Sequence, residues 1–120
     1  VIHTTGSSPS KPQQMPEIFV PRSEVLAMHL LPPAVEPLDY DSAEPNRRHL
    51  PVTVLFSSFR ADGALWASVR VDLAKFIELN REEFTSLYDV QITSPVFPNL
   101  PIIRSPMMIC RNQNVLFAGR

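Results

Sequence analysis

Apolar and polar residues alternate most regularly in the second half of the chain. Segment 52–59 is rich in β-branched and aromatic residues. In segment 64–71 the side chains divide into a more polar set and an apolar set, the apolar set being Leu65, Ala67, Val69 and Val71. Asp62-Gly63 lies between the two segments, and glycine supplies the positive φ that a tight turn requires. The pattern therefore predicts a β-hairpin with its turn at residues 60–63 and one face towards a core.

A helical periodicity follows this hairpin. Asp72 has the side chain of a helix N-cap. Apolar residues then recur at near-helical spacing: Leu73, Phe76, Ile77, Phe84 and Leu87. Residues 80–83 match a capping box, so a second short helix could begin at Asn80. We therefore predict one helix, or a broken pair of helices, on one face of the sheet.

Short apolar segments separated by prolines continue to the C-terminus. Segment 90–93 alternates as a strand does, and the prolines after it predict an extended, exposed link. Segments 107–110 and 115–118 are apolar, and the asparagines between them tolerate the left-handed geometry of a turn. These segments predict a second hairpin. The order of elements predicts an α+β fold with a small, mostly antiparallel sheet.

The first half of the chain has a different composition. Nine of the thirteen prolines fall within residues 1–51. Segment 4–14 has no apolar periodicity, so by itself it favours a disordered or polyproline conformation. Segment 23–31 fits a strand or a short helix, because Ser23 could cap a helix while the apolar residues alternate. We therefore divide the chain into a Pro-rich extended arm with an irregular connection, 1–51, and a compact α+β domain, 52–120.

Composition narrows the classes of function. The 120 residues carry 11 basic and 12 acidic side chains, so no strong field attracts nucleic acid or an anionic membrane. No apolar run reaches the roughly 18 residues of a membrane span, which predicts no membrane insertion. The single cysteine, Cys110, favours an intracellular, reducing compartment, and its apolar neighbours predict a buried side chain rather than a reactive thiol. The start at Val1 is compatible with a processed mitochondrial protein.

The sequence contains no recognisable catalytic or cofactor-binding motif. Its three glycines are too far apart to form the clustered loops that cradle phosphates. Its three histidines lack neighbouring ligands at metal-binding spacing. Ser57-Ser58 lies in a predicted strand without a glycine elbow, which favours polar strand serines over a nucleophile. We therefore predict no catalytic residue, no metal and no cofactor, and hence a protein that is not an enzyme.

The extended, proline-punctuated arm is the feature that indicates a function. Such a segment can lie along a partner, where its main chain pairs with a sheet edge. The side chains expected to bind the partner are apolar: Ile18, Phe19, Val20, Leu26, Leu30 and Leu31. We therefore predict a non-catalytic structural subunit of a larger assembly, which docks on other protein subunits through this arm and a sheet edge.

Two alternatives follow from the same sequence. The chain has nine arginines and two lysines, and arginine suits phosphate contacts and base stacking. An RNA-binding or ribonucleoprotein-associated domain would use arginines and a hairpin aromatic: Arg47, Arg48, Phe59, Arg104 and Arg111. The first hairpin offers further rings for stacking, Phe56 and Trp66. The net charge of −1 weighs against this reading. The second alternative is an accessory domain of an enzyme complex.

Overall fold

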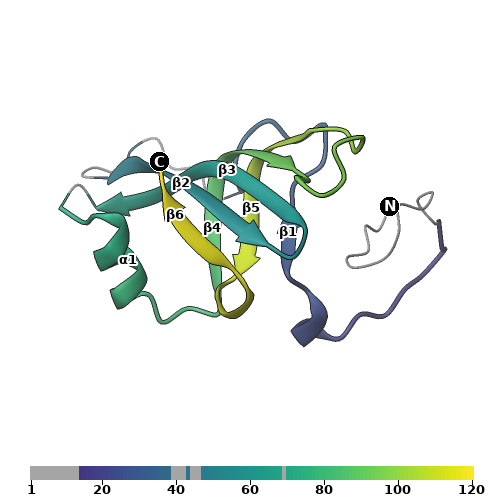
Figure 1. The fold of residues 1–120 in the computed structure, drawn as a ribbon, viewed down its shortest axis with the longest axis horizontal. Coiled ribbons are helices and arrows are strands. Elements are labelled where there is room, and N and C mark those ends of the chain that lie inside the picture. The colour runs from purple at the N-terminus through teal and green to yellow at the C-terminus, as the bar shows by residue number, and fades with distance from the viewer. Residues whose placement is uncertain (1–13, 39–42, 44–46, 69) are drawn as a thin grey trace.

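The computed structural model describes residues 14–38, 43, 47–68 and 70–120 (Figure 1). The prediction for segment 4–14 therefore lies outside the described residues except for Gln14, and so does the predicted orientation of Val69. Within the described ranges no helix has the length and apolar character required to span a bilayer.

The described residues form a six-stranded antiparallel sheet and one α-helix, which confirms a small α+β fold. The strand order is β1-β5-β4-β3-β2-β6. The strands are β1 Ala27–His29, β2 Arg47–Phe56, β3 Phe59–Ser68, β4 Phe84–Thr93, β5 Ile103–Arg111 and β6 Leu116–Gly119. The helix α1 spans Leu73–Leu79, and two short 3-10 turns are η1 Arg22–Glu24 and η2 Asn112–Asn114.

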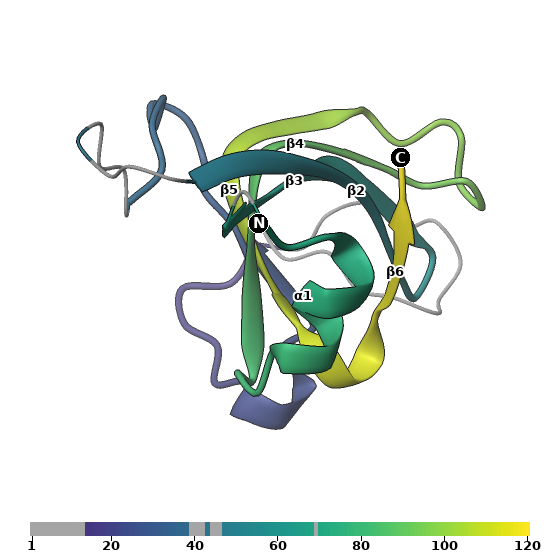
Figure 2. The ribbon, with the colours of Figure 1, turned by 90° about the vertical axis from the view of Figure 1, so that its left-hand side faces the viewer.

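The sheet is curved, and its concave side holds the core. Figure 2 shows the strands curling round a common interior, with α1 at one end of the curl. Core residues alternate along the strands, as the two-residue period of a strand requires. They are Val52, Val54, Phe56, Ala61, Leu65, Leu87, Val90, Ile92, Met108 and Cys110. Leu73 and Phe76 pack against this cluster, so α1 covers part of the core.

The first hairpin forms, but its turn was predicted in the wrong place. β2 and β3 pair over their full length, and the turn lies at Ser57 and Ser58 instead of residues 60–63. Ser57 has a φ of 51°. Gly63 lies within β3, where an added Cβ would come within 3.0 Å of the Tyr88 carbonyl oxygen. The glycine is therefore required by the close approach of β4 and not by a turn.

The helix prediction is correct at its start and wrong at its end. Asp72 caps α1, because its carboxylate accepts a hydrogen bond from the Lys75 amide at 2.8 Å. The helix ends at Leu79, and Asn80 does not begin a second one. Its side-chain oxygen accepts a hydrogen bond from the Glu82 amide at 3.0 Å, which forms a turn into β4. The apolar spacing after this turn fits the period of a strand as well as that of a helix.

The predicted second hairpin is also wrong. β6 pairs with β2 and not with β5, the strand that precedes it in the sequence. β5 already pairs with β1 on one side and with β4 on the other. Because both edges of β5 are occupied, β6 takes the free edge of β2.

Two pieces of the predicted arm belong to the sheet. Segment 23–31 contains the strand β1, which pairs with β5, so the strand alternative is correct for Ala27–His29. Ser23 caps no helix and lies within the 3-10 turn η1. β2 begins at Arg47, ahead of the boundary drawn at residue 52. Pro51 fits within β2 because the pairing with β6 begins only at Val52, so no ladder hydrogen bond is required of the proline on that side.

Candidate functional site

A cleft opens where β3 and β4 separate. Register pairs join the two strands only as far as Ala64 and Tyr88. Beyond this point, residues 65–68 of β3 pair with β2, and residues 84–87 of β4 pair with β5. In the described sheet the two facing edges therefore have no strand between them.

A β-bulge accounts for the separation. The register pairs on either side of the bulge are Asp62–Gln91 and Ala64–Tyr88. One residue, Gly63, lies between these pairs in β3, whereas two residues, Asp89 and Val90, lie between them in β4. Asp89 has a φ of 51°, in the left-handed region. An extra residue bends its strand and increases the local twist. The first residues of β4 consequently diverge from the last residues of β3.

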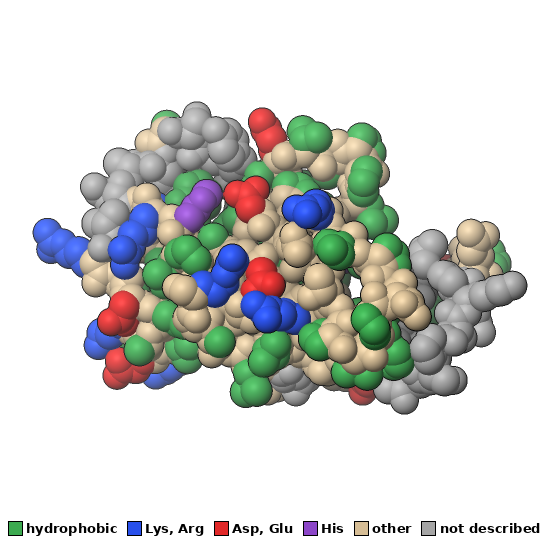
Figure 3. All heavy atoms as spheres, turned by 45° about the horizontal axis from the view of Figure 1, so that its top comes forward, with side chains coloured by type: hydrophobic (Ala, Val, Ile, Leu, Met, Phe, Trp, Pro, Cys, Tyr) green, Lys and Arg blue, Asp and Glu red, His purple; other side chains and the backbone are tan. Residues whose placement is uncertain are grey.

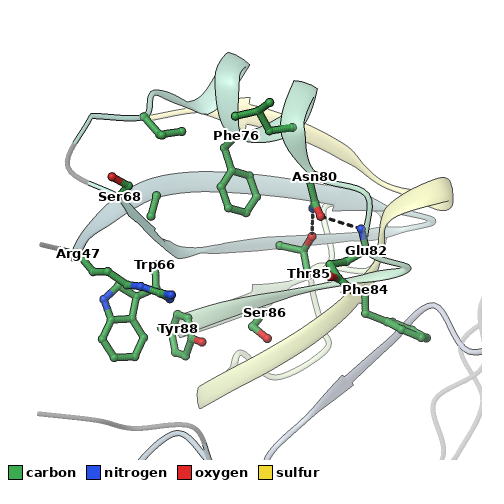
Figure 4. Close-up of a pocket in the computed structure, with 13 residues that line it drawn as sticks. Arg47, Trp66, Ser68, Phe76, Asn80, Glu82, Phe84, Thr85, Ser86 and Tyr88 are labelled. Atoms are coloured by element: carbon green, nitrogen blue, oxygen red, sulfur yellow. Dashed lines mark hydrogen bonds between the residues drawn. The ribbon is translucent and has the colours of Figure 1, made fainter. Parts of the chain in front are cut away.

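The helix closes the inner side of this cleft, which has a volume of about 450 Å³. Figure 4 shows Phe76 pointing from α1 into the space, Trp66 and Tyr88 on the opposite side, and Phe84 turned away. Most of the other lining side chains are polar: Arg47, Ser68, Asn80, Glu82, Thr85 and Ser86. The cleft therefore combines aromatic surface with hydroxyl groups and with one basic side chain at the β2 side.

Three rings and a guanidinium form one cluster beside the cleft. The centroid of the Trp66 ring lies 5.6 Å from that of Tyr88 and 6.2 Å from that of His49, with both rings edge-on to it. His49 and Tyr88 stack with centroids 6.3 Å apart. The guanidinium of Arg47 lies 5.7 Å from the Trp66 centroid. Aromatic and cation–π pairs each contribute about 0.5–1.5 kcal/mol, so the cluster holds Arg47 against the aromatic surface.

Hydrogen bonds fix the turn at the other end of the cleft. The Thr85 hydroxyl accepts a hydrogen bond from Asn80 Nδ2 at 2.8 Å and donates one to Asn112 Oδ1 at 2.5 Å. Asn112 Nδ2 donates to the Glu82 carbonyl at 2.7 Å. These bonds tie the turn between α1 and β4 to the end of β5, so this wall of the cleft is held in place.

Residues 22–30, called the anchored segment below, lie along β5. The Leu30 amide donates to the Met107 carbonyl at 3.1 Å, and the Arg111 amide donates to the Leu26 carbonyl at 2.8 Å. Both Leu26 and Leu30 are half-buried, and Leu26 packs against the core cluster. The anchored segment is therefore part of the folded domain.

The side chain of Arg111 forms the centre of this attachment and is only 7% exposed. Its Nε donates to the Val25 carbonyl at 2.9 Å, and its terminal nitrogens donate to the Arg22 carbonyl and to the Glu83 carboxylate. The guanidinium also lies 4.6 Å from the centroid of the Phe84 ring. A buried guanidinium requires partners for its charge and its N–H groups, and these contacts supply them.

Glu83 links Arg111 to the start of the anchored segment. Its second carboxylate oxygen accepts a hydrogen bond from Arg22 at 2.7 Å. The hydrogen bond from Arg111, together with the nearby charges of Arg22 and Arg111, lowers the pKa of the Glu83 carboxyl below its ordinary value. Glu83 is therefore ionised at neutral pH and holds both arginines.

Residues 14–20, called the distal segment below, have a different environment. They lie outside helix and strand, and Figure 1 shows the chain leading away from the sheet on the side opposite α1. The apolar side chains of the segment are exposed: Met15, Ile18, Phe19 and Val20. Leu31, just after the anchored segment, is also exposed. Four of the predicted partner-binding residues are thus exposed: Ile18, Phe19, Val20 and Leu31. The other two, Leu26 and Leu30, are half-buried.

The arginines considered for RNA binding lie on two separated strands. Arg47 and Arg48 belong to β2, whereas Arg104 and Arg111 belong to β5, with β3 and β4 between these strands. Arg48 donates to the Val71 carbonyl at 3.1 Å, and Arg104 is exposed. Arg111 is buried in the contacts of the anchored segment. The face drawn in Figure 3 mixes basic, acidic and apolar side chains instead of forming one basic surface.

The aromatic residues of the first hairpin also separate. Phe56 is buried in the core, and Phe59 is half-buried and stacks on it with ring centroids 5.7 Å apart. Trp66 alternates to the other face, where it meets His49 and Tyr88. Of the three rings considered for stacking, Trp66 is the one that lines the cleft.

Cys110 has the environment that its apolar neighbours predict. It is fully buried on β5, and burial raises the pKa of its thiol to about 11. The thiol is therefore protonated at neutral pH. In the part of the chain that the structure describes, no three side chains among His, Cys, Asp and Glu are grouped so that they could hold a metal ion.

Sequence reasoning missed the cleft and several of its residues, among them Phe76, Tyr88 and Ser86. Their spacing carries no common signal, because the bulge in β4 and the position of α1 bring them together. A glycine inside an alternating strand does indicate a bulge or a close backbone approach. Gly63 is such a residue, although its place directly after Asp62 predicts a turn.

No family model matches the chain, and neither a curated protein nor a solved structure matches it.

Proposed function

We propose that this chain is a non-catalytic structural subunit that joins a larger protein assembly through its distal segment. The observation that carries the proposal is the exposure of a run of apolar side chains, Ile18, Phe19 and Val20, of which Phe19 is 86% exposed. Burial of one such side chain stabilises a complex by roughly 1.5–3 kcal/mol. A contiguous exposed apolar run is therefore typical of a contact surface.

The anchored segment supports this role. It fixes the end of the distal segment at Arg22, whose side chain is bound to Glu83 of the domain. Pro16 and Pro21 flank the apolar run and restrict the conformations that the unbound segment can adopt. Docking would therefore cost less conformational entropy than it would for an unrestricted tail.

The two outer strands supply a second surface. β1 and β6 are the end strands of the described sheet, and each carries an exposed apolar side chain, Met28 and Leu116 respectively. An extended segment of a partner can pair with an edge strand. The contact would then combine the distal segment with one sheet edge.

Affinity purification from a native extract, with and without nuclease, tests the proposal. The wild-type chain should retain a fixed set of proteins after nuclease treatment, and Phe19→Ser should lose that set. Val96→Ser is the matched control, because it removes an exposed apolar side chain from a loop far along the chain. A partner set that is unchanged by Phe19→Ser would contradict the proposal.

RNA binding is retained as a second candidate because of one cluster. Arg47 lies over Trp66, and Trp66 contacts Tyr88 and His49, which is an arrangement suited to stacking an unpaired base. The nuclease arm of the same experiment separates the two candidates. A partner set that disappears with nuclease and with Trp66→Ala, but not with Phe19→Ser, would favour RNA.

A further inference from the structure

The side chains that line the cleft between β3 and β4 are chemically complementary to those of the distal segment. We propose that residues 16–21 of one copy of this chain dock in the β3–β4 cleft of a second copy. This inference rests on the proposed function, because it names the partner of the distal segment. It also gives the cleft a peptide ligand of defined composition: an extended, Pro-flanked segment with one acidic and one aromatic side chain.

Two strand edges are available to such a segment. In the described sheet, residues 65–68 pair only with β2, and residues 84–87 pair only with β5. An extended peptide can add to exposed strand edges through main-chain hydrogen bonds, while alternate side chains enter pockets. Proline at positions 16 and 21 keeps the peptide out of a helix, and the four residues between them each carry a backbone N–H that can donate to a strand edge.

The apolar side chains are complementary. Phe19 is the most exposed of the large apolar side chains described, and the cleft presents the rings of Trp66, Phe76 and Tyr88. A volume of about 450 Å³ lies within the roughly 300–1,000 Å³ of typical binding pockets. Aromatic pairs contribute beyond the area they bury, so Phe19 is the expected anchor.

Charge complementarity sets the direction of the segment. Glu17 is the one acidic residue among positions 14–21. Among the described residues, the basic side chain of Arg47 lines the β2 side of the cleft, and Arg48 donates to the carbonyl of Val71, which also lines it. A carboxylate beside a guanidinium gains charge-assisted hydrogen bonds, so Glu17 should lie at the β2 side.

The geometry favours a second copy over the cleft of the same chain. The anchored segment holds Arg22 against Glu83, and Arg111 holds the backbone at Arg22 and Val25. From this fixed point the distal segment leads away from α1, the element that closes the cleft (Figure 1). The segment therefore points outward, where another molecule can bind it.

Trp66 gives a direct test, because it is the single tryptophan of the chain and lines the cleft. The receptor is the full chain carrying Phe19→Ser, so that its own distal segment does not compete. The probe is a synthetic peptide of residues 14–21, which contains neither tryptophan nor tyrosine. We expect a saturable change in Trp66 fluorescence, and a loss of affinity of about tenfold or more for the peptide with Phe19→Ser. An unchanged emission, or equal binding of both peptides, would overturn the proposal.

A charge exchange tests the orientation. The peptide with Glu17→Arg should bind the Arg47 receptor more weakly than the native peptide does. It should recover affinity on a receptor that carries Arg47→Glu in addition to Phe19→Ser. Equal affinities in all four combinations would contradict the placement of Glu17 beside Arg47.

Sedimentation equilibrium separates this inference from the proposed function. The apparent mass of the purified full chain should rise over about a hundredfold range of concentration, and Phe19→Ser should abolish the rise. A wild-type chain that stays monomeric, but loses its protein partners on Phe19→Ser, would overturn self-association and leave the proposed function standing. The Trp66 emission of the wild-type chain can also be compared with that of Phe19→Ser. If the two differ equally at every concentration while the mass stays monomeric, the segment docks within one chain, and this would also overturn the inference.

Discussion

Phe19 in the distal segment is 86% exposed, whereas Leu26, seven positions later, packs against the core. The two segments have similar apolar content and are separated only by Pro21. The difference between them comes from partners elsewhere in the sequence. The anchored segment meets the free edge of β5 and the side chain of Arg111, while the distal segment lies outside the sheet.

The comparison shows that apolar composition does not by itself distinguish a binding segment from a structural one. Arg111 makes the distinction, because its buried guanidinium needs the carbonyls of Val25 and Arg22. These hydrogen bonds attach the chain to the domain from Arg22 onwards, whereas residues 14–20 lie outside the sheet. We therefore treat residues 22–30 as structural and residues 14–20 as the binding segment.

A comparison of two truncations should give the largest difference in the free energy of unfolding. Deletion of residues 1–30 removes β1, bares one edge of β5 and leaves the Arg111 guanidinium without its carbonyl partners. We expect the free energy of unfolding to fall by about 3 kcal/mol or more. Deletion of residues 1–20 removes none of the described hydrogen bonds of the anchored segment and should change the free energy of unfolding by less than about 0.5 kcal/mol. Urea unfolding followed by circular dichroism measures the free energy of unfolding of both truncated chains. Equal losses in the two chains would contradict the distinction between the anchored and the distal segment.

Arg111→Met isolates the central contact of the anchored segment. The substitution keeps an apolar stem but removes the hydrogen bonds to Val25, Arg22 and Glu83. A hydrogen bond from a charged group contributes about 1.5–3 kcal/mol, but the apolar methionine also removes the cost of burying the guanidinium, so we expect a net loss of about 2–3 kcal/mol in urea unfolding. Arg104→Met is the matched control on the same strand, because Arg104 is exposed and should change stability by less than about 0.5 kcal/mol. Similar losses for both variants would show that Arg111 does not hold the segment.

Cys110 reports whether the anchored segment opens. It is fully buried and lies opposite Ala27 of β1 in the sheet register. Because burial raises the pKa of the thiol to about 11, a thiol reagent should react slowly with the native chain at neutral pH. Arg111→Met should speed the reaction, since β1 would leave β5 more often. A native chain that is labelled as fast as the unfolded chain would contradict this arrangement.

The pH dependence of stability that Glu83 causes is a smaller effect, because its side chain is 45% exposed and solvent screens its charge. The folded state lowers its pKa, so its contribution to stability is present above the pKa of the unfolded chain. The contribution is lost as the pH falls through the folded pKa. Wild type should therefore be more stable than Glu83→Gln at neutral pH, and the two should converge in acid. A difference that persists at low pH would assign the effect to something other than the charge of Glu83.

The sequence predicted the local features of the fold better than the long-range ones. The alternation of Leu65 and Ala67 and the cap at Asp72 depend on neighbouring residues, and both are observed. The pairing of β6 with β2 depends on which strand edges remain free after the rest of the sheet has formed. Periodicity along one segment carries no information about that choice.

The candidate site was even less accessible to sequence reasoning. Arg111 was grouped with the residues for RNA because arginine suits phosphate contacts and base stacking. Its partners Arg22, Val25 and Glu83 come from two distant parts of the chain, and only the folded sheet brings them together. The cleft depends likewise on a single extra residue in β4.

Hydrogen–deuterium exchange on the dilute, purified chain tests the division between the two segments most directly. The account predicts that the amides of Leu30 and Arg111, which donate to Met107 and Leu26, exchange slowly. The amides of residues 17–20 should exchange at the rates of an unfolded peptide. Equal protection of the two segments, or a protected distal segment in the dilute chain, would contradict the assignment of residues 14–20 as a binding segment held out from the domain.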